Sequence, residues 1–67
     1  MKNRVKTLRE SRNLTQKELG EMVNVSRQAI NAIETGKYDP SIWLAYHLAN
    51  YFGLAIEEVF QFEEDRK

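Results

Sequence analysis

One short stretch of the chain, Arg27 to Glu34, carries the side chains best suited to specific recognition. Drawn as a helix at about 100° per residue, it places its aliphatic residues on one side. The other side holds one cation, two amides and one methyl group: Arg27, Gln28, Asn31 and Ala32. Arginine suits O6 and N7 of guanine, an amide suits N6 and N7 of adenine, and an alanine methyl can contact the thymine methyl. The pattern predicts a helix that reads bases in a major groove.

The alternative is an ordinary polar surface on a small helical domain. Two observations favour DNA. The four outward positions include no acid. The chain before them also has the signals of a second helix and a tight turn, which would hold such a helix out from the domain.

Those signals begin at Thr15. Thr15 and Glu18 have the spacing of a capping box and predict a helix from Gln16. Its apolar face is expected to comprise Leu19, Met22 and Val23. Within it, Gly20 predicts the close approach of another helix, because a glycine there otherwise costs about 1 kcal/mol relative to alanine.

Asn24 can adopt the left-handed conformation that ends such a helix, and Ser26 can cap the next one. The turn between the two helices is therefore about three residues long, which is typical of a helix-turn-helix. We assign that motif to residues 16–35, and Gly36 follows as a helix stop.

The stretch resembles the Cro/C1-type helix-turn-helix of phage repressors and XRE-like regulators. The matching residues are Gln16, Leu19, Val23, Val25, Ser26, Ile30, Ile33, Glu34, Gly36 and Pro40. Two positions depart from the family pattern: Gly20 replaces a preferred alanine, and Asn24 a preferred glycine. The resemblance runs from about Asn3 to Phe60. It implies an all-α, five-helix lambda-repressor-like DNA-binding domain, which we take as one domain over residues 1–67.

The resemblance also bears on residues outside the outward face. We expect phosphate contacts from Gln16, Lys17, Ser26, Lys37 and Tyr38. In the family the loop over residues 36–40 lies along the DNA backbone, so Lys37 is its natural cation; the alternative is a solvated lysine. Tyr38 can stack or donate its hydroxyl. Arg9 by itself suggests a phosphate contact, but the resemblance implies a salt bridge to Glu34 that locks the first helix to the third.

Three further helices are expected around the motif. The first covers residues 2–12, with Val5 and Leu8 facing inward, and the fourth covers about 41–52. The inward face of the fourth is predicted to comprise Ile42, Leu44, Ala45, Leu48, Ala49 and Phe52, while Trp43, His47 and Asn50 point outward. A short fifth helix opens at Glu57, with Val59 and Phe60 turned inward.

The tail from Phe60 to Glu64 alternates apolar and polar residues, which is strand periodicity. No other strand is predicted, so we expect this short C-terminal strand, within residues 61–67, to pair with a second copy of the chain. The expected dimer interface contains Trp43, Phe60 and Phe62. The alternatives are a frayed acidic tail and a Trp43 covered by the tail of its own chain. Residues 65–67 are expected to be disordered.

Composition narrows the class of protein. With 67 residues, no cysteine and one histidine, the chain cannot build a thiolate or multi-histidine metal site, so we expect no metal, cofactor or small-molecule ligand. No apolar run predicts a membrane span or signal peptide, and we expect a cytoplasmic protein. Net charge is zero, but residues 1–40 carry eight cations and five acids, whereas residues 41–67 carry two and five. The basic part is expected to face phosphate.

Three classes of function remain to be compared. The preferred one is a sequence-specific DNA-binding regulator that acts as a homodimer on a pseudo-palindromic operator, with repression favoured over activation. An antitoxin that represses its own operon fits the same residues. The second class is a protein-interaction module that keeps the fold without binding DNA, which zero net charge and Trp43 motivate. An enzyme is disfavoured, because the chain has no nucleophile–base pair, paired carboxylates or phosphate loop.

Overall fold

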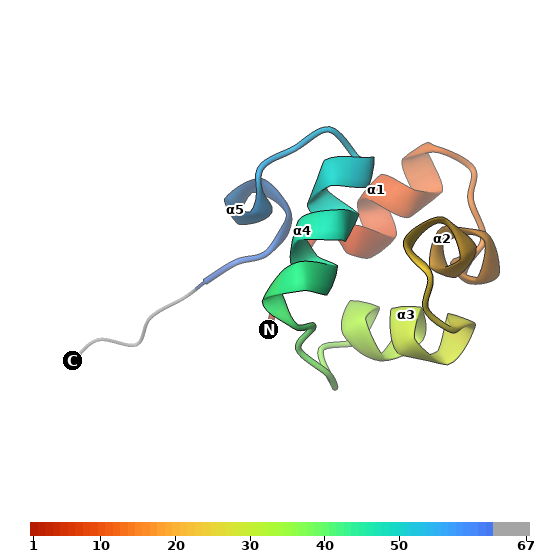
Figure 1. The fold of residues 1–67 in the computed structure, drawn as a ribbon, viewed down its shortest axis with the longest axis horizontal. Helices are drawn as coiled ribbons and strands as arrows, with labels where there is room; N and C mark the ends of the chain where they lie inside the picture. Colours follow the sequence, from red (N-terminus) through yellow and green to blue (C-terminus); the bar gives the residue numbers. More distant parts are fainter. Residues whose placement is uncertain (63–67) are drawn as a thin grey trace.

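A computed structural model describes residues 1–62, and these residues form five short helices (Figure 1). In chain order they are α1 (Val5–Ser11), α2 (Gln16–Val23), α3 (Arg27–Glu34), α4 (Ile42–Tyr51) and α5 (Ile56–Val59). The predicted all-α, five-helix architecture is confirmed. Figure 1 shows α3 and the loop after it along the lower edge of the molecule, with α5 at the end remote from the start of α3.

Three of the helices begin at a hydroxyl cap. Thr15 Oγ1 accepts the backbone N–H of Glu18 at 3.0 Å, and Glu18 Oε1 accepts the N–H of Thr15 at 2.9 Å, which completes the predicted capping box. Ser26 and Ser41 cap α3 and α4 in the same way, each through the residue three positions later. These bonds satisfy donors that a helix start otherwise leaves unpaired.

The start of α5 has no hydroxyl to accept such a bond, because its N-cap is Ala55. Glu58 supplies the other half of the arrangement, and its Oε1 accepts the N–H of Ala55 at 2.8 Å. The acids of the first turn also suit the positive end of the helix dipole.

The turn between α2 and α3 is held by Asn24, which adopts the left-handed conformation at φ +67°. Val25 then donates its N–H to the carbonyl of Gly20 at 2.9 Å. A Cβ added at Gly20 would lie 2.5 Å from the Val25 carbonyl oxygen and 3.3 Å from that of Ser26. The close neighbour predicted for Gly20 is therefore the backbone of the turn and not another helix.

We expect Gly20→Ala to lower the free energy of unfolding by about 1 kcal/mol, since overpacking costs roughly 1–3 kcal/mol and helix propensity returns about 1 kcal/mol. For a domain of this size the melting temperature should fall by about 4–8 °C. Circular dichroism melts measure the change, with Glu21→Ala on the same helix as an exposed control. A melting temperature for Gly20→Ala equal to or higher than that of the wild type would show that the turn can move away from the added methyl group without loss of stability.

The core lies between the helices and, among residues 1–62, is apolar except for the Arg9–Glu34 ion pair at its edge. Its buried side chains are Val5, Leu19, Ile30, Ile33, Ala45, Leu48, Ala49, Phe52, Val59 and Phe60. Ile42 and Met22 were predicted to face the core but do not: their exposed fractions are 62% and 57%. Ile42 lies about 70° from the centre of the buried face of α4, and Met22 about 110° from that of α2, so each falls on the flank.

The two ends of the described chain pair with each other. Asn3 and Phe60 form an antiparallel bridge: Arg4 donates its N–H to the Val59 carbonyl at 2.8 Å, and Gln61 donates its N–H to the Lys2 carbonyl at 2.9 Å. This pairing also explains why α1 begins at Val5 and not at residue 2, since Asn3 is held in the bridge and Arg4 is the N-cap.

The bridge corrects two expectations about the tail. The partner of Phe60 is Asn3 of the same chain, a residue predicted to lie in the first helix. The Phe60 side chain is 1% exposed inside its own domain, so the interface role predicted for it is wrong. The remainder of the predicted strand and the predicted disorder at 65–67 lie outside the described residues.

Candidate nucleic-acid interface

The outward face of α3 is open to solvent. Arg27, Gln28 and Asn31 are exposed and Ala32 is half-buried, while Ile30 and Ile33 behind them are fully buried. The two buried isoleucines determine which face of α3 packs against the core, and therefore which face is exposed to solvent. The structure leaves three of the four predicted base-reading side chains accessible; the reading itself stays a prediction.

Ala32 is half-buried, and the loop after α3 folds back onto its backbone. Lys37 and Tyr38 both donate their backbone N–H groups to the Ala32 carbonyl, at 2.9 and 3.2 Å. Gly36 makes this reversal possible with a φ of +78°. The Lys37 and Tyr38 side chains are both exposed beside α3, where the predicted phosphate contacts require them.

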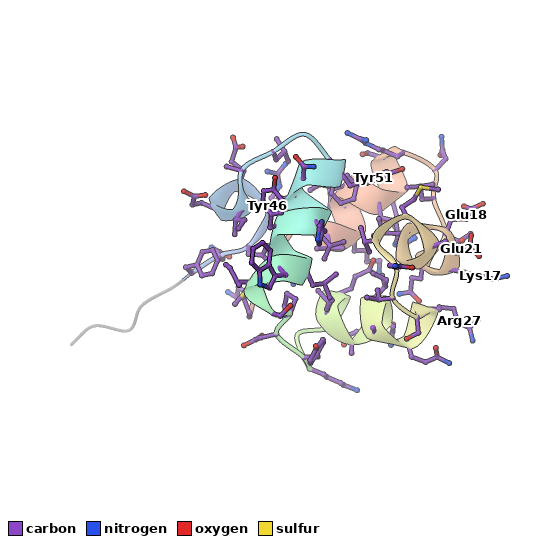
Figure 2. The ribbon with its side chains drawn as sticks, in the orientation of Figure 1. Lys17, Glu18, Glu21, Arg27, Tyr46 and Tyr51 are labelled. Carbon is purple, nitrogen blue, oxygen red and sulfur yellow. The ribbon has the colours of Figure 1, made fainter. Side chains whose placement is uncertain are left out.

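Lys17 and Arg27 extend from the same end of the molecule, one from α2 and one from the start of α3 (Figure 2). Together with Ser26, Gln28, Val25 and Glu21 they line a shallow surface pocket. Ser26 Oγ accepts the Ala29 N–H at 3.1 Å, and its own hydroxyl hydrogen can donate to a phosphate. Lys17 and Ser26 thus lie together at the surface, and their phosphate contacts remain a prediction.

Sequence reasoning missed Glu21 in this pocket. It considered acids only on the face of α3, whereas Glu21 lies one helical turn after Lys17 on α2 and therefore on the same side. A phosphate bound beside Lys17 would be repelled by this carboxylate.

The half-buried Gln16 side chain is held by two hydrogen bonds to other side chains of the protein. Its Nε2 donates to Asn31 Oδ1 at 3.1 Å and to Glu34 Oε1 at 3.0 Å, so both amide hydrogens are used. The phosphate contact predicted for Gln16 would require one of these bonds to break.

Arg9 and Glu34 form the salt bridge that the family resemblance implies. Arg9 Nε lies 2.7 Å from Glu34 Oε2 and Nη2 lies 3.2 Å from Oε1, while Nη1 donates to the Leu14 carbonyl at 2.7 Å. The Glu34 side chain is 2% exposed. The hydrogen bond with Glu34 raises the pKa of Arg9 above its ordinary value, although burial opposes the shift. Arg9 is thus bound internally and not directed to a phosphate.

A separate apolar surface lies on α4, comprising Ile42, Trp43 and Tyr46; we call it the α4 patch. Trp43 is 71% exposed, so the described residues do not cover it, and Tyr46 is 48% exposed. Phe62, at the end of the described chain, is 54% exposed. Two of the three residues predicted for the dimer interface are therefore accessible.

His47 is exposed and contacts the Tyr46 ring edge-on at 5.6 Å between centroids. Among residues 1–62, no cluster of three or more histidine, cysteine, aspartate or glutamate side chains is arranged to hold a metal ion. None of the helices in that range has the length and apolar character needed to cross a bilayer.

Two helices joined by a three-residue turn, with the second exposed and carboxylate-free on its outer face, define a helix-turn-helix protein. The family model for the helix-turn-helix matches residues 5–59. The chain belongs to the Cro/C1-type, XRE-like helix-turn-helix family, and it is a DNA-binding transcriptional regulator and not an enzyme.

Known proteins agree with this assignment. An HTH-type transcriptional regulator of Methanocaldococcus jannaschii is 52% identical over 65 residues, which covers 97% of this chain and 98% of that protein. The HTH-type regulator YgzD of Bacillus subtilis is 46% identical over 65 residues, with 97% and 98% coverage. In structure, the clp gene regulator ClgR of Corynebacterium glutamicum superposes with a TM-score of 0.73 at 22% identity. That match covers 81% of this chain and 57% of the ClgR chain, and it shows the fold alone.

Proposed function

We propose that this regulator binds a pseudo-palindromic operator as a homodimer and represses transcription by occupying the DNA. Each copy would insert α3 into a major groove, with half-sites roughly 34 Å apart. The observation that carries the proposal is the outer face of α3, whose Arg27, Gln28 and Asn31 are exposed and include no acid. A protein with this role works where the DNA is, in the cytoplasm and on the nucleoid.

The α4 patch supports the homodimer. Exposed aromatic residues are enriched at interfaces, and Trp43 with Tyr46 and Ile42 places three large apolar side chains within five residues. Phe62 would extend the contact from the end of the described chain. A domain of this size also gains stability from a partner subunit.

Gln28→Ala tests the base-reading face. We expect it to cost about 1–3 kcal/mol on the preferred operator, which is about 5- to 150-fold in affinity, and to relax the preference at one base pair in each half-site. The operator is obtained by selecting bound sequences from a random duplex pool, and affinities for it and its single-base variants are then titrated. An unchanged preference at every position would contradict the role assigned to Gln28.

Lys37→Ala serves as the matched variant, because it removes a charge from the same edge without touching α3. It should weaken binding to all sequences alike and reduce the slope of log affinity against log salt by about 1 per contact. A change in base preference for Lys37→Ala would instead show that Lys37 contacts bases and not the DNA backbone.

The second candidate function is a protein-interaction module, including an antitoxin, and the exposed Trp43 favours it. The two are separated by titrating the protein with random duplex at low salt. A DNA-binding regulator should bind random duplex weakly at low salt, and its affinity should fall steeply as the salt concentration rises. Failure to bind at any salt, together with no enrichment from the pool, would favour the module.

A further inference from the structure

A chain of side-chain hydrogen bonds runs from the core to the outer face of α3. It links Arg9 on α1, Glu34 on α3, Gln16 on α2 and finally Asn31 on α3. A side-chain amide can rotate by 180° and exchange the places of its oxygen and nitrogen, so the residue type alone does not determine which of the two atoms Asn31 presents to solvent. Here each link fixes the orientation of the next.

The first two links set the orientation of Gln16. Arg9 donates two hydrogen bonds to the Glu34 carboxylate, whose oxygens can only accept. The end of the Gln16 amide that lies 3.0 Å from Glu34 Oε1 must therefore be the NH2 group, since its oxygen would face another oxygen. The nearly complete burial of the Glu34 side chain, at 2% exposure, keeps this acceptor in place.

The last link sets the orientation of Asn31. The second hydrogen of Gln16 Nε2 points to Asn31 at 3.1 Å, so the atom that receives it must be the oxygen Oδ1. Oδ1 of Asn31 is thus engaged by Gln16, whereas its Nδ2 group, with two donor hydrogens, has no hydrogen-bond partner among residues 1–62, and Asn31 is exposed. The residue type alone predicts an adenine contact, but that contact needs Oδ1 and Nδ2 side by side at the base edge.

We propose that Asn31 reads the major groove only as a hydrogen-bond donor and that Gln16 is the positioning residue that makes it so. Guanine presents two adjacent acceptors, O6 and N7, and suits such a group best; thymine presents O4 alone. Adenine offers only one acceptor, N7, and its donor, N6, competes with Gln16 for the Asn31 oxygen. The inference deepens the proposed function and rests on it: Gln16 acts on base choice without touching DNA.

The test compares sequences selected from a random duplex pool by the wild-type protein and by Gln16→Met, which keeps the length of the side chain and removes its donors. The position read by Asn31 is the one whose preference Asn31→Ala abolishes. At that position the wild type should prefer guanine. Gln16→Met should shift the ratio of guanine to adenine by about tenfold or more toward adenine, because the freed Asn31 amide can then make a bidentate contact with adenine. Lys17→Met on the same helix is the control and should leave base preference unchanged.

A guanine preference in the wild type that Gln16→Met shifts supports the proposal. A wild-type preference for adenine, or an equal preference in both proteins, overturns it while the regulator function stands. If the wild type enriches no sequence, the proposed function fails and this inference fails with it.

Two measurements keep the proposal testable if Gln16→Met does not fold. Asn31→Asp retains an acceptor toward Gln16 but has no donor, and it should lose the guanine preference. In the free protein, side-chain amide NMR should show slow hydrogen exchange for the Gln16 NH2 group and fast exchange for that of Asn31. The reverse pattern would show that Asn31 points its oxygen outward and would overturn the inference without any DNA.

Discussion

Arg9→Met should lower the free energy of unfolding by about 3 kcal/mol, because removing one partner of a buried ion pair leaves the other charge uncompensated. Glu34 would keep only the Gln16 amide, and the Leu14 carbonyl would lose its 2.7 Å bond. Small domains have only about 0.05–0.15 kcal/mol of stability per residue, so this is a large share. Melting should shift by more than about 10 °C, as measured by thermal and urea unfolding.

The double variant Arg9→Met, Glu34→Leu is the decisive control. Replacing both charges with apolar side chains removes the buried carboxylate, so most of the lost stability should return. Glu10→Gln is the matched surface control. Glu10 lies 4.0 Å from Arg9 and is exposed, and its loss should cost less than about 0.5 kcal/mol. A decrease below about 1 kcal/mol for Arg9→Met would mean that the bridge is dispensable.

The direction of the Arg9 pKa shift adds a pH expectation. Glu34 raises the pKa of Arg9, so the stability that Arg9 contributes is fully present below its unfolded-state pKa and is lost only as pH rises beyond it. The stability difference between wild type and Arg9→Met should therefore not change through titration of Arg9 at neutral or mildly alkaline pH.

The second large effect is expected at the α4 patch. Trp43→Glu places a charge where two copies would meet, and the dimer should dissociate, which sedimentation equilibrium measures directly. Affinity for a full operator should then fall about 100-fold or more, because the second half-site no longer gains from effective concentration. Affinity for an isolated half-site should stay the same, since α3 is untouched.

Met22→Glu is the control for this experiment. Met22 is 57% exposed on α2, so the variant adds the same charge to another exposed apolar residue outside the α4 patch. An unchanged mass for Trp43→Glu would place the interface elsewhere. A monomeric Trp43→Glu that kept full operator affinity would show that the protein binds without pairing.

Much of the fold follows from the sequence because its signals are short in range. Thr15, Ser26 and Ser41 each bond to a residue three positions away, so the starts of α2, α3 and α4 can be read from neighbouring residues alone. The spacing of Ile30 and Ile33 likewise determines which face of α3 is buried, and with it the outer set of Arg27, Gln28 and Asn31. The Arg9–Glu34 bridge came from the family resemblance, since nothing local links those residues.

Only the tertiary structure decided the contacts between residues far apart in the chain. The partner of Phe60 is Asn3, and the atom that crowds Gly20 is the Val25 carbonyl oxygen. The orientation of Asn31 depends on Gln16, fifteen residues earlier, and on Glu34 behind both. A residue type states which hydrogen bonds a side chain can make. Which of them remain for DNA depends on the partners that packing brings within about 3 Å, and no pattern along the chain records that distance.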